Sequence, residues 1–549
     1  MAWSLLVLGV AAASYAWVVS LPLTGIDAIP TIAAAHVEHA RELPSVLTRE
    51  LRGGAQPGGS YYRPLTLLTY GVESLAWEWN SRGHHATDLA CHALAALAIF
   101  WMCRLAFAQG LMTALAVVAI FLIHPVVNEV VPAVSRRQEP LLVIAFAVTL
   151  IGACRLPAAR GWALLLLGSV AAVCSVERGL VIPGIVFAYL LLHRPGPESP
   201  GSRLRLALLW TAPVLAVALG FYALRAALFG TGGVFFEPAR AARISSRYFL
   251  QLVHPQQLID LHMPTSMLAA APWLAAALVG ATVTGWIFWC SERKGTLLFA
   301  LAWISGYGLL FAVAGQGNSW YPYTAVPALA LLLVTVGTEG WRAIASGGAA
   351  RLRGVLTLLL VTGILMPLVV TSPALFRYPA WEIAGSLSDR FLSELRRVAR
   401  ELPGDTTPVV INLPGHYRES DSQLRVTRSA AILWPRSIEI WRDVNEIDRE
   451  IVILGAADFV GEVSMPVIDL DAGGPGADDL RANDPQADTR ISIAFHRGAS
   501  VYKAPDRIGT TIAPLPEGQG RGFTFPLKAP AQGHRHTVFV FDGERLLPY

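Results

Sequence analysis

Runs of about 20 mostly apolar residues, separated by short polar connections, fill the first two-thirds of this 549-residue chain. An α-helix needs about 20 such residues to cross the hydrocarbon core of a bilayer, because it rises only about 1.5 Å per residue. Eleven runs predict eleven membrane-spanning helices, the first of them retained because it lacks the basic start and cleavage site of a signal peptide. They cover approximately residues 3–22, 86–106, 110–130, 138–154, 161–176, 179–193, 206–229, 268–290, 295–314, 320–338 and 354–372.

The charged residues divide the chain into two parts. Up to Thr371 there are 23 basic and 15 acidic residues, and after it there are 20 basic and 24 acidic ones. The charged fraction thus rises from about 10% to about 25%, as between a lipid-embedded body and a water-soluble domain. We therefore predict a transmembrane domain at 1–372, with an external loop of interfacial helices at 23–80, and a soluble domain at 373–549.

The soluble region carries its own secondary-structure signals. Residues 381–402 show the spacing of an amphipathic helix, which Pro403 and Gly404 end. Strand-like runs separated by Gly-, Pro- and Asp-rich turns follow at 409–413, 451–454, 491–495 and 536–541. The fold class predicted for the whole chain is an all-α polytopic membrane bundle with a C-terminal soluble α/β domain.

Composition excludes several classes of function. A net charge of +4 is too small for a nucleic-acid binder, which must neutralise many phosphates. The five cysteines lie in or beside apolar runs without a C-x-x-C pair, which argues against disulfides and thiolate metal sites. No glycine-rich phosphate-binding loop is present, so ATP-driven transport is disfavoured.

Basic residues in the connections indicate an orientation. With the N-terminus in the cytoplasm, one set of connections holds 11 basic and three acidic residues, as the positive-inside rule expects. The odd number of spans then places the C-terminal domain outside the cell. The opposite topology stays open, because raw basic counts on the two sides are nearly equal.

Polar residues that a membrane domain rarely carries collect at the predicted outer ends of the spans. Such residues within or beside spans usually mark a site or a pathway. His85, Asp88 and His92 fall on one stripe of a helix. As an alternative, these side chains only hydrogen-bond one another and hold the bundle together. The set comprises Asp27, Arg63, His85, Asp88, His124, Asn128, Glu129, Arg137, Glu139 and Glu177.

A zinc site is not predicted from these residues. His85, Asp88, His124 and Glu129 are the available ligand types, but they form neither an H-x-x-x-H nor an H-E-x-x-H pattern. The aromatic residues Trp320, Tyr321 and Tyr323 are typical of a membrane-interface belt and less so of a sugar-binding platform.

Four stretches resemble a known family in their order along the chain. They are GIDAIPTI (25–32), YYRPL (61–65), GHHATDLACH (83–92) and HPVVNEVVPAVSRRQEPL (124–141), followed by SVERG (175–179). They resemble integral-membrane glycosyltransferases of the C superfamily (GT-C), especially the protein O-mannosyltransferase-like branch. The fourth stretch is the most specific, and the resemblance covers about residues 1–190.

The resemblance implies a reaction and roles for individual residues. Such enzymes move a sugar from a polyprenyl-phosphate carrier to a hydroxyl acceptor, a protein or a glycan, at the extracytoplasmic face. Asp27 falls on the acidic residue of the first external loop and is the candidate catalytic base. Arg63 and Arg137 are the candidate clamps of the lipid phosphate, and a divalent cation is left open as cofactor. The residues that would shape the substrate pocket are His85, Asp88, His124, Glu129 and Glu139.

Departures from the family pattern keep alternatives open. Ala28 follows Asp27 where the family has a second acid, and Val176 stands where a lysine is common. A catalytically degenerate subunit, which keeps the fold and binds lipid or protein in a membrane complex, is therefore the rival interpretation. Asp27 could also be a structural N-cap of the helix that follows it. A transporter is disfavoured because the charged groups crowd one membrane face.

The predicted location is the plasma membrane of a prokaryote, which the Arg-rich, Lys-poor composition favours. The partners expected at this location are the polyprenyl-phosphate donor, the hydroxyl acceptor and membrane lipid. Nucleic acid is not expected as a partner.

Overall fold

A computed structural model describes most of the chain. It covers residues 2–25, 27–51, 61–194, 199–230, 238–253, 291, 293–314, 318, 320–376, 379–411, 413–418, 429–433, 435–453, 456–460, 467–469, 489–496, 511–514, 521–527 and 535–548.

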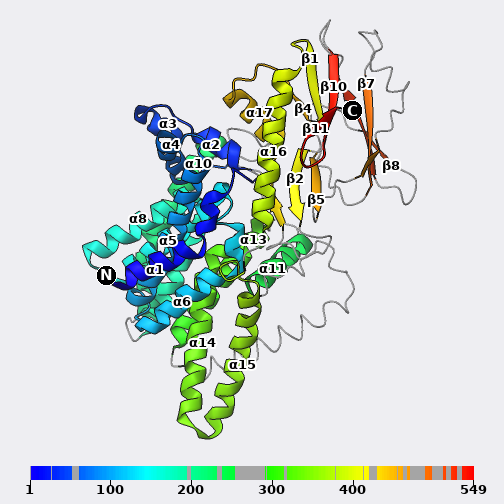
Figure 1. The fold of residues 1–549 in the computed structure, drawn as a ribbon. Coiled ribbons are helices and arrows are strands. Elements are labelled where there is room, and N and C mark those ends of the chain that lie inside the picture. The colour runs from blue at the N-terminus through cyan, green and yellow to red at the C-terminus, as the bar shows by residue number, and fades with distance from the viewer. Residues whose placement is uncertain are drawn as a thin grey trace. The chain divides into compact units, whose positions relative to one another are not determined.

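The chain forms two compact units (Figure 1). The first consists of residues 1–20, 34–378 and 423–427, and the second of residues 21–33, 379–422 and 428–549. Residues 21–33, which include Asp27, thus group with the C-terminal part of the chain. The division at residue 372 into a membrane-embedded and a soluble domain stays a prediction.

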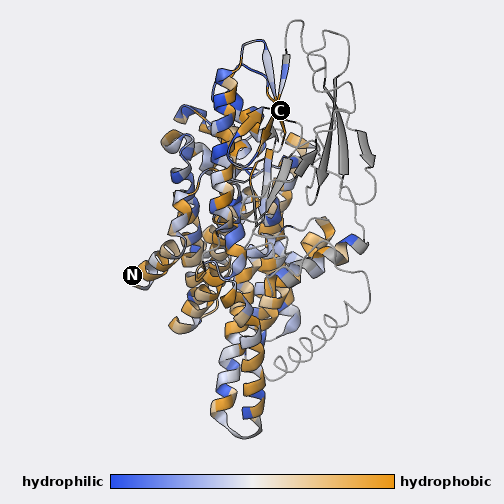
Figure 2. Cartoon of the chain, turned by 45° about the vertical axis from the view of Figure 1, so that its right-hand side comes forward, coloured by the Kyte–Doolittle hydropathy of each residue, from blue (hydrophilic) through white to orange (hydrophobic). Residues whose placement is uncertain are grey.

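The first unit is helical. Its longer helices are α1 (Ala2–Ser14), α4 (Pro64–Trp77), α5 (Ser81–Leu105), α6 (Leu111–Ile123), α7 (Gln138–Cys154), α8 (Ala159–Ser175), α9 (Ile182–Ala188), α10 (Pro200–Phe229), α11 (Pro238–Val253), α13 (Lys294–Ala314), α14 (Val326–Ser346) and α15 (Gly348–Val370). Helix α3 (Leu43–Val46) and the 3-10 turns η1 (Ala16–Ser20) and η2 (Ala40–Glu42) are short, and η6 (Tyr189–His193) is a π-helical turn. Hydrophobic residues run along these helices (Figure 2).

Six helical segments of the described chain are long and apolar enough to cross a membrane. They are Ser81–Leu105, Val134–Cys154, Pro200–Phe229, Lys294–Ala314, Tyr321–Ser346 and Ala350–Val370. Three shorter apolar helices, α1, α6 and α8, lie within other apolar runs that were predicted from the sequence to span the membrane. The run at 268–290 lies outside the described residues. The chain is therefore mostly helical with six candidate membrane helices, and the count of eleven stays a prediction.

Glycines allow α7 and α8 to approach each other closely. An added Cβ at Gly152 would lie 2.3 Å from the backbone nitrogen of Leu165, and one at Gly168 would lie 2.7 Å from that of Thr149. Small residues of this kind permit backbone contact between neighbouring helices in membranes.

Four short 3-10 turns gather at one end of the first unit. They are η3 (Pro125–Glu129), η4 (Val134–Arg136), η5 (Glu177–Val181) and η7 (Tyr321–Ala325). Helices joined by short connections run antiparallel, so the end of α6, the start of α7 and the end of α8 come to the end where α5 begins. The run expected as one span at 110–130 is in fact broken at His124, whose backbone leaves the helix.

The second unit contains the remaining helices and the sheets. Its elements are α16 (Ala380–Glu401), α17 (Pro435–Val444), and strands β1 (Thr406–Ile411), β2 (Leu413–Arg418), β3 (Ser429–Ala431), β4 (Val452–Ile453), β5 (Ala456–Val460), β6 (Val467–Asp469), β7 (Thr489–His496), β8 (Thr511–Pro514), β9 (Arg521–Leu527), β10 (Arg535–Phe541) and β11 (Leu546–Pro548). Helix α2 (Ala28–Ala35) begins in this unit.

Three sheets are formed in the described part of this unit. In the order β11-β10-β1-β4, strand β1 pairs in parallel with both neighbours, and β10 pairs antiparallel with β11. The other sheets have the orders β3-β2-β5 and β6-β7-β9-β8. Helix α16 buries Trp381, Phe391 and Leu395, and Phe391 meets Phe541 of β10 edge to face. The helix coincides with the amphipathic run expected at 381–402.

Candidate functional site: paired arginines at one end of the helical unit

Three arginine–glutamate pairs connect the turns at this end of the helical unit. Arg63, just before α4, places Nε 2.9 Å from Glu177 Oε2 in η5. Arg136 in η4 places Nη1 2.9 Å from Glu129 Oε2 in η3.

The third pair joins Arg178 of η5 to Glu139 in the first turn of α7. Each of the three pairs thus ties together segments that the sequence separates by 7 to 114 residues.

Each of these arginines also faces an aromatic ring. The guanidinium carbon of Arg63 lies 4.8 Å from the ring centre of Tyr61, and that of Arg136 lies 3.8 Å from Trp320. Arg178 lies 4.5 Å from the ring of Tyr321. Contacts of this kind hold a planar guanidinium in a fixed orientation.

The aromatic pair Trp320–Tyr321 brings the three arginines into one neighbourhood. These consecutive residues cover Arg136 and Arg178, respectively. Arg63 and Arg178 both interact electrostatically with the Tyr321 phenol. The aromatic segment that the sequence assigns to an interface belt therefore also lies over cationic side chains.

The exposure of these groups decides what they could bind. The side chains of Arg63, Arg136 and Arg178 are 12%, 12% and 11% exposed. They are shielded from bulk water yet reach the surface. Guanidinium groups bind phosphate through paired hydrogen bonds, and these bonds are strongest where water is scarce. An anionic headgroup could be held here by exchange for one of the glutamates.

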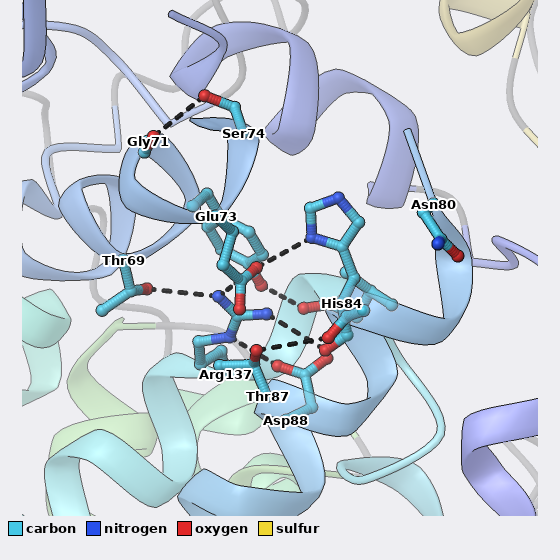
Figure 3. Close-up of polar contacts among 12 residues, drawn as sticks. Thr69, Gly71, Glu73, Ser74, Asn80, His84, Thr87, Asp88 and Arg137 are labelled. Atoms are coloured by element: carbon cyan, nitrogen blue, oxygen red, sulfur yellow. Dashed lines mark hydrogen bonds and ion pairs between the residues drawn. The ribbon is translucent and has the colours of Figure 1, made fainter. Parts of the chain in front are cut away.

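Arg137, a second arginine in the same turn, points into the protein (Figure 3). Its Nε lies 2.5 Å from Asp88 Oδ1 and its Nη1 2.7 Å from Glu73 Oε2. Its guanidinium also lies 4.0 Å from the ring centre of Tyr70. The Arg137 side chain is fully buried, so the structure surrounds it with protein carboxylates.

The histidines of the predicted site are buried side chains. His124 Nδ1 accepts the N–H of Val126, so the ring proton lies on Nε2, which donates to the Leu252 carbonyl at 2.9 Å. His92 Nδ1 lies 2.8 Å from the Tyr323 hydroxyl. His85 has no exposed surface. For His92, this supports the bundle-holding alternative.

Asp27 belongs to the second compact unit. It immediately precedes α2, and its carbonyl accepts the N–H of Thr31 at 3.0 Å. The turn before it depends on Gly25, whose φ of +114° is a conformation that favours glycine. The Gly25 N–H donates to the Ile432 carbonyl at 3.0 Å, which anchors this turn within the same unit. Asp27 thus occupies the N-cap position of α2, and its role as a base stays a prediction.

The structure thus sorts the predicted residues of the helical unit. Arg63, Glu129 and Glu139 lie in the arginine–glutamate pairs, whereas Asp88 and Arg137 form an internal cluster. His85 and His124 are buried. The sequence interpretation did not select Arg136, Arg178, Glu73 or His84. Two motifs in the sequence could have pointed to the arginines. The double arginine in SRRQEP includes Arg136, and the adjacent Glu and Arg in SVERG include Arg178.

No group of three or more His, Cys, Asp or Glu side chains that could hold a metal ion occurs among the residues that the structure describes. The divalent cation that the family resemblance leaves open therefore has no identified ligand set in this part of the chain.

Comparison with known proteins gives one kind of likeness. No family model matches the chain, and no curated protein matches it. A crystal structure of ArnT from Cupriavidus metallidurans bound to undecaprenyl phosphate is similar over 97% of this chain and 99% of that chain, with 13% identity and a TM-score of 0.43. The apo state of the same protein is similar over 84% and 93% of the two chains, with 15% identity and a TM-score of 0.42. A likeness with this identity and TM-score gives no argument about function. The function proposed below is therefore argued from the residues of the site.

Proposed function

We propose that this chain is a membrane glycosyltransferase that moves one sugar from a polyprenyl-phosphate-linked donor to a hydroxyl acceptor, a protein or a glycan, at the extracytoplasmic face. The O-mannosyltransferase-like branch, the location in a prokaryotic plasma membrane and the extracytoplasmic position of the C-terminal domain belong to the same proposal.

The observation that carries the proposal is the set of three partly buried arginines, Arg63, Arg136 and Arg178, at one end of a hydrophobic helical unit. A phosphate on a long lipid chain arrives within the membrane and has to be held at its surface. Oriented guanidinium groups in a water-poor setting suit this anion better than flexible lysines do. Aromatic stacking keeps the guanidinium groups in place when no ligand is bound.

Arg63 is the best candidate for the phosphate clamp among the residues that the sequence selects. Its partner Glu177 is 24% exposed, so this carboxylate stays hydrated when a phosphate displaces it. Arg137 has two buried carboxylates as partners, and release of either one would leave a buried charge uncompensated. We assign Arg63 to the donor phosphate and give Arg137 a positioning role.

Asp27 is proposed as the base. Its carboxylate would take the proton from the acceptor hydroxyl while that oxygen attacks the anomeric carbon. The bond from the anomeric carbon to the phosphate oxygen breaks, and polyprenyl phosphate leaves with the electron pair. Arginine at the phosphate stabilises the negative charge that develops there.

Sugar transfer in membranes tests the proposal. Membranes that contain the native chain or Asp27→Asn at equal expression are supplied with labelled polyprenyl-phosphate sugars and a panel of acceptors. We expect label in the acceptor with the native chain and a loss of at least about 100-fold with Asp27→Asn. Equal transfer by both chains would remove Asp27 from the reaction, and no transfer by a folded native chain would refute the enzyme.

A second candidate is a non-catalytic assembly subunit that binds lipid or protein with the same fold. The observation in its favour is that Arg63, Arg136 and Arg178 each already have a glutamate partner, as a purely structural network requires. Binding of polyprenyl phosphate without any transfer is the result expected for such a subunit.

A further inference from the structure

Three arginines gather at the end of the helical unit that lies opposite the candidate site. Arg104 is in the last turn of α5, Arg293 directly precedes α13, and Arg342 lies near the end of α14. Helix α5 begins at the candidate site, α13 leads to η7, and α14 follows η7. The three arginines therefore share the far end of these helices, and we call them the arginine triad.

Gln109, in the connection between α5 and α6, joins two members of the triad. Its backbone carbonyl accepts a hydrogen bond from Arg104 Nη1 at 2.6 Å, and its side-chain oxygen accepts one from Arg293 Nη1. Gln109 is buried. Because a glutamine carries no charge, it holds the two guanidinium groups near each other without neutralising them.

Glu339 of α14 connects the third member. Its Oε1 lies 2.9 Å from Arg342 Nη1 and 4.0 Å from Arg293 Nε. Among the residues that the structure describes, Glu339 is the one carboxylate that pairs with the triad. The connections expected at this end hold 11 basic and three acidic residues in the whole sequence. Three guanidinium groups and one carboxylate therefore leave an excess of positive charge for an anion to compensate.

The triad is open to a ligand. The side chains of Arg293 and Arg342 are 31% and 51% exposed, and Arg104 is also exposed. Glu339 is 17% exposed, so its carboxylate stays in contact with water when a ligand takes its place at Arg342. Binding of an anion here leaves no buried charge without a partner, unlike at Arg137.

Exposed apolar residues adjoin the triad. Trp101 and Leu105 lie four residues apart on α5, on either side of Arg104 in the sequence, and both are exposed. Trp101 is one helical turn further from the end of α5 than Arg104. Trp341, the neighbour of Arg342 on α14, is 66% exposed. Tryptophan is typical of the headgroup level of a membrane, and an apolar face below the cations suits an acyl chain.

We propose that the arginine triad binds the phosphate of an anionic phospholipid, whose acyl chains lie along the exposed apolar residues of α5. Basic pockets between membrane helices hold anionic headgroups, and guanidinium groups bind phosphate through paired hydrogen bonds. A lipid bound to all three arginines links the ends of α5, α13 and α14. It stabilises the folded protein because it binds this state and not the unfolded chain. This inference goes beyond sugar transfer, since the triad lies away from the candidate site.

Thermal unfolding of the purified full-length protein in a non-ionic detergent tests the inference. Phosphatidylglycerol is the probe, and phosphatidylcholine with the same acyl chains and inorganic phosphate are the comparison ligands. We expect phosphatidylglycerol to raise the unfolding midpoint in a saturable way, and the other two to change it little. The concentration at half of the effect gives an apparent affinity for each variant.

Arg342→Gln should weaken the affinity for phosphatidylglycerol by about 10-fold, because one charge-assisted contact is lost. Arg160→Gln is the matched control. Arg160 is an exposed arginine in the first turn of α8, at the same end of the unit, and has no part in the triad. Its variant should bind as the native chain does. An equal loss in both variants would indicate diffuse attraction between charges and would overturn the defined site.

Glu339→Gln provides a test with the opposite sign. It removes the carboxylate that competes with the lipid for Arg342, so the affinity for phosphatidylglycerol should rise by about two- to five-fold. An unchanged affinity in this variant or in Arg342→Gln would overturn the proposal. An equal effect of phosphatidylcholine or of inorganic phosphate on the native chain would overturn it as well. None of these measurements uses the sugar donor, so this proposal and the proposed function can fail separately.

Discussion

At the scale of single residues, two arginines from the sequence motifs have different surroundings. Arg63 is 12% exposed and has one partly exposed partner, whereas Arg137 is fully buried between two carboxylates. The sequence assigns both to the donor phosphate. Their surroundings predict different consequences of substitution.

Arg63→Gln should weaken binding of the donor and leave the fold intact. Loss of a charge-assisted contact to phosphate corresponds to about 10- to 100-fold in affinity. The KM for the polyprenyl-phosphate sugar is the quantity to measure, with Arg82→Gln, an exposed residue of α5, as control. A native KM in the Arg63 variant would remove this residue from the donor site.

Arg137→Gln should destabilise the protein. The substitution leaves Glu73 and Asp88 buried without their shared cation, which costs about 3–5 kcal/mol. The unfolding midpoint of the purified protein measures this loss. A stable Arg137 variant with a raised KM for the donor would instead support the phosphate clamp that the sequence predicts.

At the scale of elements, close contact between helices depends on particular glycines. Gly152→Ala should lower the unfolding midpoint, because its Cβ would lie 2.3 Å from backbone atoms of α8. Gly306→Ala in α13 is the matched control, since nothing lies within 4 Å of its added Cβ. The control should be neutral or stabilising by up to about 1 kcal/mol. Equal effects of the two substitutions would contradict close packing of α7 and α8.

Helix α16 is tied to β11 by a carboxylate whose pKa is shifted. Arg397 donates to Glu394, which lowers the pKa of Glu394 below 4.5, and the Leu546 N–H also donates to it at 3.1 Å. The stabilisation is present above the ordinary glutamate pKa and is lost as the pH falls through the lower, folded value. Glu394→Gln should therefore lower the unfolding midpoint at neutral pH and reduce its acid dependence. An identical acid profile in the variant would refute this contribution.

At the scale of the whole molecule, the orientation in the membrane is the main testable property. Glu544→Cys, an exposed position near the C-terminus, should react with a membrane-impermeant maleimide in intact cells. Arg351→Cys, exposed at the start of α15, should react only after the cells are opened. The reverse pattern would establish the flipped topology, and the unsubstituted chain controls for the native cysteines.

The sequence by itself determined the helices, because the length and polarity of an apolar run are local properties. Helices lie in the apolar runs that the structure describes, and α16 begins and ends within one residue of its expected bounds. The polar motifs also predicted at which ends of the helices charged side chains gather. Arg63, Glu129 and Glu139 were selected on this basis, and the structure finds them in ion pairs at one end of the unit.

Only the tertiary structure decided which charges meet. Glu73, His84 and Arg137 come from separate segments, and spacing along the chain contains no information on distances between helices. The same holds for Arg178, which meets Glu139 from 39 residues away, and for the aromatic rings over the arginines. Burial sets the energy of a charged group as strongly as its chemical type does, and burial is fixed by packing of the whole unit. The motifs therefore indicate candidate residues, and the fold decides which of them are buried and which stay near the surface.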